Sequence, residues 1–373
     1  MMTRSACWIA ALLFAALVLA KFNPQTGFTS LIRFGETWQD RRHSSLQGLS
    51  IETVPASPGY DGQFYAQIAL DPLLRGAETE RLLDVPAYRA RRILAPATAA
   101  VLGCGNSWWT LQVYALLNVA CWFALGWILF TSIDPRNLAG FARWVGCMFS
   151  MGVLDSVRQS LVDLPALLLL TLAIRSSAQA HAGKSALWLS LGNLAKETNL
   201  LGTLALTGEG LTQAGRRRNT VLMILAAVLP LGLWSLYVRQ RFSTATASEG
   251  LGNFTWPFFG LCMQAKIGFG ELLRGNYDSR YTFGLLAIIG LLTQTVVLWR
   301  TPKLQSPWWR VGVAYSLLLP FLSLWVWMGY WGACRAVLPL TIAFNLLLPA
   351  NRAFWPLWTI GNLTLLHAVW RFL

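Results

Sequence analysis

Long apolar runs alternate with short polar segments along most of this chain. Several runs reach about 20 residues, which is enough for a helix to cross a bilayer core about 30 Å thick. We predict membrane spans at about residues 6–20, 107–131, 142–154, 160–174, 219–238, 281–299, 311–329, 334–349 and 354–370. The stretch 186–211 has basic flanks on both sides, which favours a tight helical hairpin with Lys196, Glu197 and Thr198 at its outer tip. The pattern predicts an all-α, polytopic membrane protein of about ten or eleven transmembrane helices.

The hydropathy pattern also divides the predicted single membrane domain, residues 1–373, into three parts. The first apolar run, 6–20, looks somewhat like a signal peptide but lacks a clear small-residue cleavage site, so we expect a retained first helix. Residues 21–106 are predicted to form a large extracytoplasmic loop, in which 93–103 ("ILAPATAAVLG") lie as a helix at the interface. The remaining helix bundle follows at 107–373. Within it, the aromatic stretch "WPFFGLCMQAKIGFGELL" predicts an interfacial amphipathic helix.

Composition excludes a soluble protein, and with it nucleic acid as the expected partner. Hydrophobic residues make up 55% of the chain and charged residues 12%, with a mean hydropathy of +0.48. The net charge of +14 would suggest nucleic acid binding in a soluble protein. Here the basic residues collect in short loops between apolar runs, as in the loops that stay on the cytoplasmic side. These residues are Arg175 and Lys184, the triplet 216–218, and Arg300, Lys303 and Arg310. We therefore expect membrane lipids, and no nucleic acid, as partners.

One polar cluster, "GYDGQFYAQIALDP" at 59–72, stands out in the predicted outer loop. On a helix, Asp61, Tyr65 and Ile68 would share one face, which holds a carboxylate beside an aromatic ring near the membrane surface. This arrangement suits a general base that accepts a proton from a hydroxyl group, with Gln63 and Tyr65 contacting the substrate. The alternative is a solvated turn, because Asp-Gly is a common turn dipeptide. Other acids could serve as the base instead: Glu36, Glu52, Asp71 and Asp155.

Several cations accompany this cluster on the predicted outer side. Arg89 and Arg92 lie three residues apart and could fork onto phosphate oxygens. Arg335, at the outer mouth of a late helix, and Lys196 are further candidates. The alternative for the arginines is headgroup anchoring. For Lys196 and Glu197 it is a structural ion pair with each other, since charges inside an apolar hairpin are costly unless paired or functional.

The sequence lacks the common motifs of metal, nucleotide and serine-hydrolase chemistry. It contains no HExxH, no Gly-rich phosphate loop and no GxSxG, and its three His are isolated. The six Cys are scattered without a CxxC. We therefore predict neither a metal nor another cofactor.

The order of the short motifs resembles that of polytopic glycosyltransferases of the GT-C class. "YDGQFYAQIALDP" is similar to the W-D-x-x-(Y/F)-x-x-I-A segment of the GPI mannosyltransferase II (PIG-V-like) families and their bacterial membrane relatives, with Tyr60 where Trp is usual. "YRARRILAPATAAVL", "LAKETNLL" and "CRAVLPLTIAFNLLL" stand, in order, where those families have a juxtamembrane helix, a cation-Thr-Leu segment and a late R-x-x-L-P-L helix.

The resemblance implies a transferase that takes a sugar, a hexose and possibly mannose, from a polyprenyl-phosphate donor. The acceptor would be a hydroxyl of a glycan, lipid or protein, and the anomeric carbon would be inverted. Asp61 would be the base, and Arg89, Arg92, Lys196 and Arg335 would hold the departing lipid phosphate. The donor carries the activation, so no cofactor is implied. The resemblance also implies a bacterial inner membrane, with the site facing the periplasm or exterior.

Two other functions remain compatible with the residues. A transporter or flippase of lipid-linked sugars or other amphiphiles could use the intramembrane Lys196 and Glu197 along its pathway. A transporter, however, is expected to spread polar groups through many spans, often in paired halves. A non-catalytic scaffold could use the outer charges as headgroup anchors.

Overall fold

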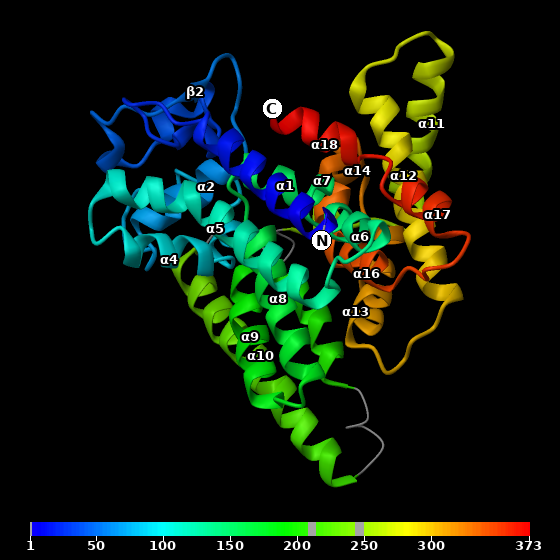
Figure 1. Ribbon diagram of the computed structural model, residues 1–373. Coiled ribbons are helices and arrows are strands. Elements are labelled where there is room, and N and C mark those ends of the chain that lie inside the picture. Colours follow the sequence, from blue (N-terminus) through cyan, green and yellow to red (C-terminus); the bar gives the residue numbers. More distant parts are fainter. Residues whose placement is uncertain (1, 208–213, 243–249) are drawn as a thin grey trace.

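The chain is mostly helical, and a computed structural model describes residues 2–207, 214–242 and 250–373, with side chains omitted at 214–216 (Figure 1). The first helix, α1 (Met2–Leu19), packs against the rest of the fold. The Phe14 ring stacks on Trp122, with centroids 3.9 Å apart, and on Phe372 of the last helix, α18 (Leu365–Phe372), at 5.2 Å. The first and last helices therefore share one apolar core with α5 (Ser107–Ile133).

The predicted outer loop is a packed lobe with its own core, drawn in blue to cyan in Figure 1. Its elements are η1 (Thr29–Leu31), β1 (Phe34–Gly35), η2 (Glu36–Arg41), η3 (Ser44–Leu46), β2 (Thr53–Val54), α2 (Gly62–Leu70), α3 (Pro86–Ala90) and α4 (Leu94–Leu102). β1 and β2 pair in parallel, with Phe34 opposite Thr53. Ile32, Phe34 and Ile68 are fully buried in this lobe, which rests on α5. The buried apolar side chains fix the lobe, and α2 within it, against the bundle.

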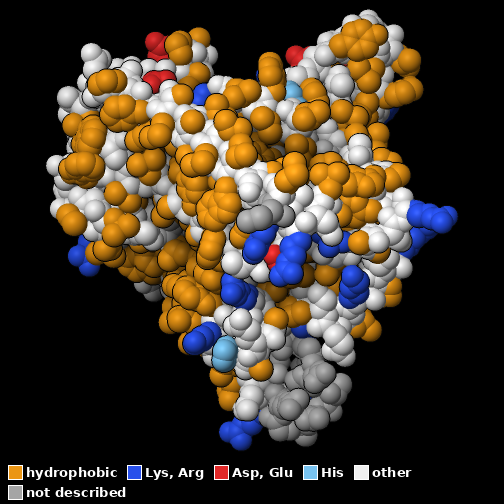
Figure 2. Space-filling model, viewed as in Figure 1, with side chains coloured by type: hydrophobic (Ala, Val, Ile, Leu, Met, Phe, Trp, Pro, Cys, Tyr) orange, Lys and Arg blue, Asp and Glu red, His pale blue; other side chains and the backbone are white. Residues whose placement is uncertain are grey.

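The bundle follows, and its elements are α5, α6 (Leu138–Met148), α7 (Met151–Arg158), α8 (Asp163–Ala178), α9 (Ala182–Ala195), η4 (Glu197–Leu206), α10 (Ala214–Arg241), η6 (Leu251–Asn253), α11 (Phe259–Leu273), α12 (Ser279–Arg300), α13 (Pro307–Ser316), η7 (Leu319–Phe321), α14 (Leu324–Met328), α15 (Tyr330–Ala336), α16 (Leu338–Leu347), α17 (Phe354–Gly361) and α18. Its surface carries many apolar side chains (Figure 2). On α10 the side chains of Leu225, Leu229, Leu233 and Leu236 are all more than half exposed. An apolar stripe of this kind fits contact with lipid chains.

Fewer helices than predicted could cross a membrane alone. Within the described ranges, α1, α5, α10 from residue 217, and α12 are long and apolar enough, and α15 with α16, bent by 66°, makes a fifth if the pair is one span. Of the ten or eleven predicted spans, the structure thus supports about four or five by helix length and composition. The expected span 311–329 is broken into α13, η7 and α14 around Pro320, and 354–370 breaks between α17 and α18. The first break is explained by Pro320, because proline cannot donate the backbone hydrogen bond that would continue a helix.

The 186–211 stretch does turn back at the predicted tripeptide. Helix α9 ends at Ala195, Lys196 is extended, and the 3-10 helix η4 returns from Glu197 to Leu206. Residues 208–211 of the predicted hairpin lie outside the described part. The expected interfacial helix at 256–273 is α11, which lies beside α12 in Figure 1, with Gln264 packed on Gly284. It is thus one half of a helical hairpin rather than a lone surface helix.

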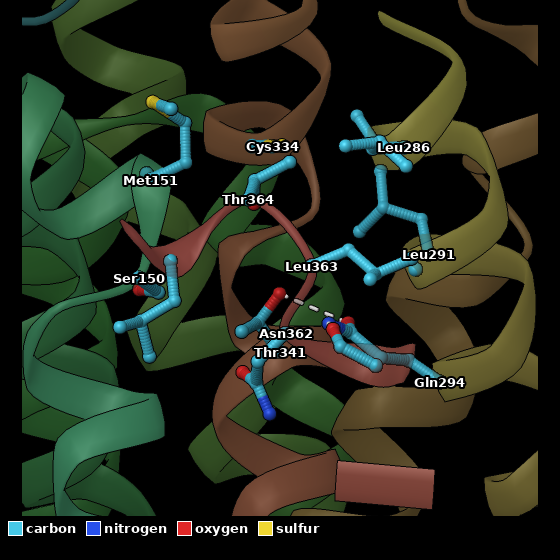
Figure 3. Close-up of a pocket in the computed structure, with 15 residues that line it drawn as sticks. Ser150, Met151, Leu286, Leu291, Gln294, Cys334, Thr341, Asn362, Leu363 and Thr364 are labelled. Carbon is cyan, nitrogen blue, oxygen red and sulfur yellow. Dashed lines mark hydrogen bonds between the residues drawn. The ribbon is translucent and has the colours of Figure 1, made fainter. Parts of the chain in front are cut away.

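Polar side chains hold the late helices together. Thr341 Oγ1 donates to Gln294 Oε1 at 3.0 Å, and the Gln294 amide donates to the Gly361 carbonyl at 2.7 Å (Figure 3). They line a pocket of about 20 Å³, which is room for about a single water. Buried hydrogen bonds of this kind join helices in apolar surroundings.

Candidate functional site

A cavity of about 550 Å³ lies between the N-terminal lobe and the bundle. Segments far apart in the sequence meet around it: the loop before α2, the chain after α3, the start of α8, the α9–η4 turn and α15. Its polar lining includes Tyr60, Asp61, Tyr65, Tyr88, Arg91, Arg92, Asp163, Lys196, Glu197, Asn253 and Arg335. The fold thus gathers most of the candidate residues into one place.

Two glycines fix the position of Asp61. Gly59 has φ +75°, and a Cβ there would lie 2.4 Å from the Gly35 nitrogen. A Cβ on Gly62 would lie 2.2 Å from the Gln159 carbonyl oxygen at the end of α7. Only glycine allows these close backbone approaches. The Gly-Tyr-Asp-Gly turn therefore holds Asp61 between the lobe and the bundle.

Replacing Gly62 with Ala should destabilise the packing of this turn against α7. The new methyl group would meet backbone oxygen of Gln159, so α2 must move away from α7 and carry Asp61 with it. We expect a loss of about 1–3 kcal/mol in the free energy of unfolding, typical of overpacking, which thermal unfolding of the detergent-purified protein measures. Gly232→Ala, on the exposed face of α10 with nothing within 4 Å of its Cβ, is the matched control. Equal stability of the two variants would refute this account of the turn.

The Asp61 carboxylate is paired and still accessible. Its Oδ1 accepts a hydrogen bond from Arg89 Nη2 at 2.8 Å, and its side chain is 31% exposed at the cavity. Burial opposes ionisation, but the guanidinium of Arg89, followed by that of Arg335, holds the pKa of Asp61 below its ordinary value. Asp61 is therefore an anion at neutral pH, as a general base must be.

Arg89 stands behind Asp61 and does not line the cavity. Its Nε and Nη2 form a fork on Asp84, at 2.9 and 2.7 Å. Although burial disfavours a charged guanidinium, the carboxylates of Asp61 and Asp84 and the neighbouring Tyr65 raise the pKa of Arg89 further. The carboxylates of Asp61 and Asp84 thus hold the Arg89 guanidinium in one position, and Arg89 in turn orients the Asp61 carboxylate.

Arg92 connects the N-terminal lobe to the α9–η4 turn of the bundle. It forks onto Glu197, with Nε–Oε2 at 2.9 Å and Nη2–Oε1 at 2.6 Å, and its Nη1 donates to the Tyr65 hydroxyl at 2.9 Å. Tyr65, only 1% exposed, therefore ties Arg92 to the helix that follows Asp61. The spacing of three residues between Arg89 and Arg92 does not place them on one helix face, because α3 ends at Ala90 and Arg92 lies beyond it.

Lys196 and Glu197 do not pair with each other in the structure. Lys196 Nζ donates to Asp163 Oδ1 at 2.7 Å, and Arg335 Nη1 lies 3.3 Å from Asp163 Oδ2. Asp163 therefore holds two cations in the cavity wall. The Tyr60 hydroxyl accepts from Arg335 Nη2 at 2.9 Å and from the Trp331 indole at 2.8 Å. Both cations predicted on the bundle side thus face the same space as Asp61.

Part of the cavity lining is apolar. Leu161, Val162, Leu200 and Leu322 line it, and Leu251, Phe254 and Trp325 line it while remaining exposed at the surface, Trp325 by 80%. A lining that combines charged groups with exposed apolar groups suits an amphiphile, whose polar head and hydrocarbon tail need different surroundings.

The remaining candidates lie elsewhere. The buried Gln63 amide bridges Gly35 and Pro58, which gives it a structural place in the turn. Glu36 accepts from the Ala56 N–H, and Asp71 accepts from Arg75, Gly76 and Thr79 in the loop after α2. Glu52 is exposed, and Asp155 is buried under Arg335 and Arg371. None of these four acids lines the cavity, so Asp61 is the best placed base among the candidates.

Sequence reasoning missed four contributors: Tyr60, Asp84, Asp163 and Trp331. Asp84 lies five residues before Arg89, a spacing that could have suggested a local ion pair. The contact of Trp331 with Tyr60 joins residues 271 positions apart, and no local pattern predicts it.

Comparisons with known proteins identify no family. No protein-family model matches the chain, and neither a curated protein nor a solved structure does. Within the described ranges, no group of three or more His, Cys, Asp or Glu is placed to hold a metal ion.

Proposed function

We propose that this protein is a membrane glycosyltransferase of a GT-C-like type, which moves a hexose, possibly mannose, from a polyprenyl-phosphate donor to an acceptor hydroxyl. The observation that carries the proposal is the cavity itself. Its lining brings together an accessible carboxylate, Asp61, three cations, Arg92, Lys196 and Arg335, and several exposed apolar side chains. In this proposal the cavity faces the extracytoplasmic side of a bacterial inner membrane.

The reaction needs two groups at a fixed separation, a base and an anion site. The acceptor oxygen attacks the anomeric carbon as the bond from that carbon to the phosphate oxygen breaks, so the configuration inverts. The acceptor proton passes to Asp61, and the lipid phosphate leaves with the bonding electrons. Because the acceptor hydroxyl becomes acidic only as the new bond forms, a carboxylate with an ordinary or lowered pKa suffices. Its negative charge also favours the positive charge that develops on the sugar ring.

The cations would stabilise the leaving group. Lys196 has three donor positions, and in the structure it uses two of them, on Asp163 at 2.7 Å and on the Arg335 carbonyl at 3.4 Å. One donor position therefore remains for a phosphate oxygen. Arg335 and Arg92 are held in place by their carboxylates before the ligand arrives, so little reorganisation is needed at the moment of reaction.

The decisive experiment offers the purified protein a panel of polyprenyl-phosphate hexoses with soluble and lipid acceptors. We expect the release of polyprenyl phosphate together with a product of inverted anomeric configuration. Proteoliposomes loaded with the same donors test the alternative. Movement of the donor across the bilayer without product would favour a flippase and overturn the proposal.

A further inference from the structure

A second group of arginines lies outside the cavity, beyond Tyr60 and Trp331. Its members, Arg33, Arg158 and Arg371, come from the lobe, from α7 and from α18. None of them lines the cavity around Asp61. The proposed transfer reaction leaves them without a role.

Contacts between the three elements bring these arginines together. The Ile32 and Gln159 carbonyls both approach Gly62, so the backbone next to Arg33 lies close to the backbone next to Arg158. Arg371 Nη2 lies 3.5 Å from Asp155 Oδ1, and Arg158 follows Asp155 by three residues on α7, on the same helix face.

Trp331 and Arg335 separate this group from the cavity. The Arg371 guanidinium lies 4.1 Å from the Trp331 ring centroid, and the Trp331 indole donates to Tyr60 at the cavity wall. Arg335 Nε lies 3.4 Å from Asp155 Oδ2, while its Nη groups face the cavity.

The group has too few carboxylates. Within the described part of the chain, Asp155 is the one carboxylate within ion-pair distance of Arg33, Arg158 or Arg371, and it also serves Arg335. The Arg33 and Arg158 side chains form no hydrogen bond or ion pair with any described residue. Burial, then the charges of Arg33 and Arg371, lower the pKa of Arg158 to about 10. Burial and Arg371 lower the pKa of Arg33 as well. Three like charges with one carboxylate within ion-pair distance among them favour a bound anion.

We propose that Arg33, Arg158 and Arg371 form a second anion site, which binds a phosphate group separately from the Asp61 cavity. Planar guanidinium groups fork onto phosphate oxygens, and two of the three have no protein acceptor to give up first. The phosphate could belong to an anionic phospholipid headgroup or to a water-soluble phosphate compound. The site does not depend on the proposed transfer reaction.

Binding of inorganic pyrophosphate to the full chain in a neutral detergent tests the site. Isothermal titration calorimetry should show saturable binding that weakens at least about tenfold in Arg158→Gln and in Arg33→Gln, the loss expected for one charged hydrogen bond. Arg352→Gln, an exposed arginine outside both sites, should bind as the wild type does. Lys196→Gln, which alters the Asp61 cavity, should weaken only the phosphate binding proposed for that cavity and should leave the binding that is lost in Arg158→Gln unchanged. Loss of binding in Lys196→Gln with retention in Arg158→Gln would place the anion in the cavity and overturn the proposal.

Thermal unfolding separates an anion site from a structural role. Without an anion, Arg158→Gln should unfold at a temperature no lower than the wild type, because the fold disfavours that charge. Pyrophosphate should then raise the unfolding temperature of the wild type and leave that of the variant unchanged. A variant that is less stable without anion, and equally stabilised by it, would show that Arg158 is structural and contradict the proposal.

Nanodiscs distinguish the source of the phosphate. Native mass spectrometry should show phosphatidic acid retained by the wild type and lost from Arg158→Gln if the ligand is a lipid headgroup. Retention of neither phosphatidic acid nor pyrophosphate, or equal retention by both proteins, would refute the site.

Discussion

Asp61→Asn should abolish sugar transfer while the protein still folds and inserts into the membrane. The amide keeps the shape of the side chain but cannot accept the acceptor proton, so we expect transfer to fall by about 10²–10⁴-fold, the usual contribution of a general base. Because Arg89 is also held by Asp84, with two hydrogen bonds, it should stay in place in the variant. The rate of product formation from a polyprenyl-phosphate sugar measures the effect.

Glu36→Gln is the matched control for this experiment. Glu36 belongs to the same lobe and was a rival base, but its carboxylate accepts from the Ala56 N–H and does not line the cavity. The control should retain wild-type transfer. A nearly unchanged rate in Asp61→Asn, or a lost one in Glu36→Gln, would assign the base elsewhere and remove the mechanism proposed above.

Arg335→Met should have the largest effect on stability. Arg335 lies within 3.4 Å of Asp155 and 3.3 Å of Asp163, and these two carboxylate side chains are only 1% and 8% exposed. Without Arg335, Asp163 keeps only Lys196 as an ion-pair partner among the described residues, and Asp155 keeps only Arg371 at 3.5 Å. Removing one partner from buried ion pairs typically costs about 3–5 kcal/mol. The free energy of unfolding in detergent micelles should fall by this amount. Transfer should fall as well, because Tyr60 and the proposed phosphate site lose a donor.

Arg335→Lys and Arg352→Met serve as controls. Lysine keeps the charge but cannot fork between Asp155, Asp163 and Tyr60, so this variant should recover part of the stability and little of the transfer. The exposed Arg352 should tolerate Met to within about 0.5 kcal/mol. If Arg335→Met were as stable as the wild type, the buried ion pairs would not hold α7, α8 and α15 together in the way the structure indicates.

The helical, membrane-spanning class and several candidate residues could be predicted from local sequence. Apolar runs are set by residue type and length, so α1, α5, α10 and α12 were visible directly. The number of spans could not be predicted in this way. The sequence of α17 and α18 is apolar enough to resemble one span, but the helix breaks between them, where side chains and turns supply the backbone hydrogen bonds. The glycines beside Asp61 were also visible, but their steric reason lies in Gln159, nearly 100 residues away.

By itself, the sequence determined that this chain is an apolar helical protein with a polar segment after its first helix, since these properties follow from composition and local pattern. Only the tertiary structure decided which charges pair. It joined Lys196 to Asp163, Glu197 to Arg92 and Asp61 to Arg89, and it separated the cavity from the second arginine group. The physical reason is that an ion pair requires two atoms within about 4 Å, and that distance depends on how distant segments pack rather than on their spacing along the chain.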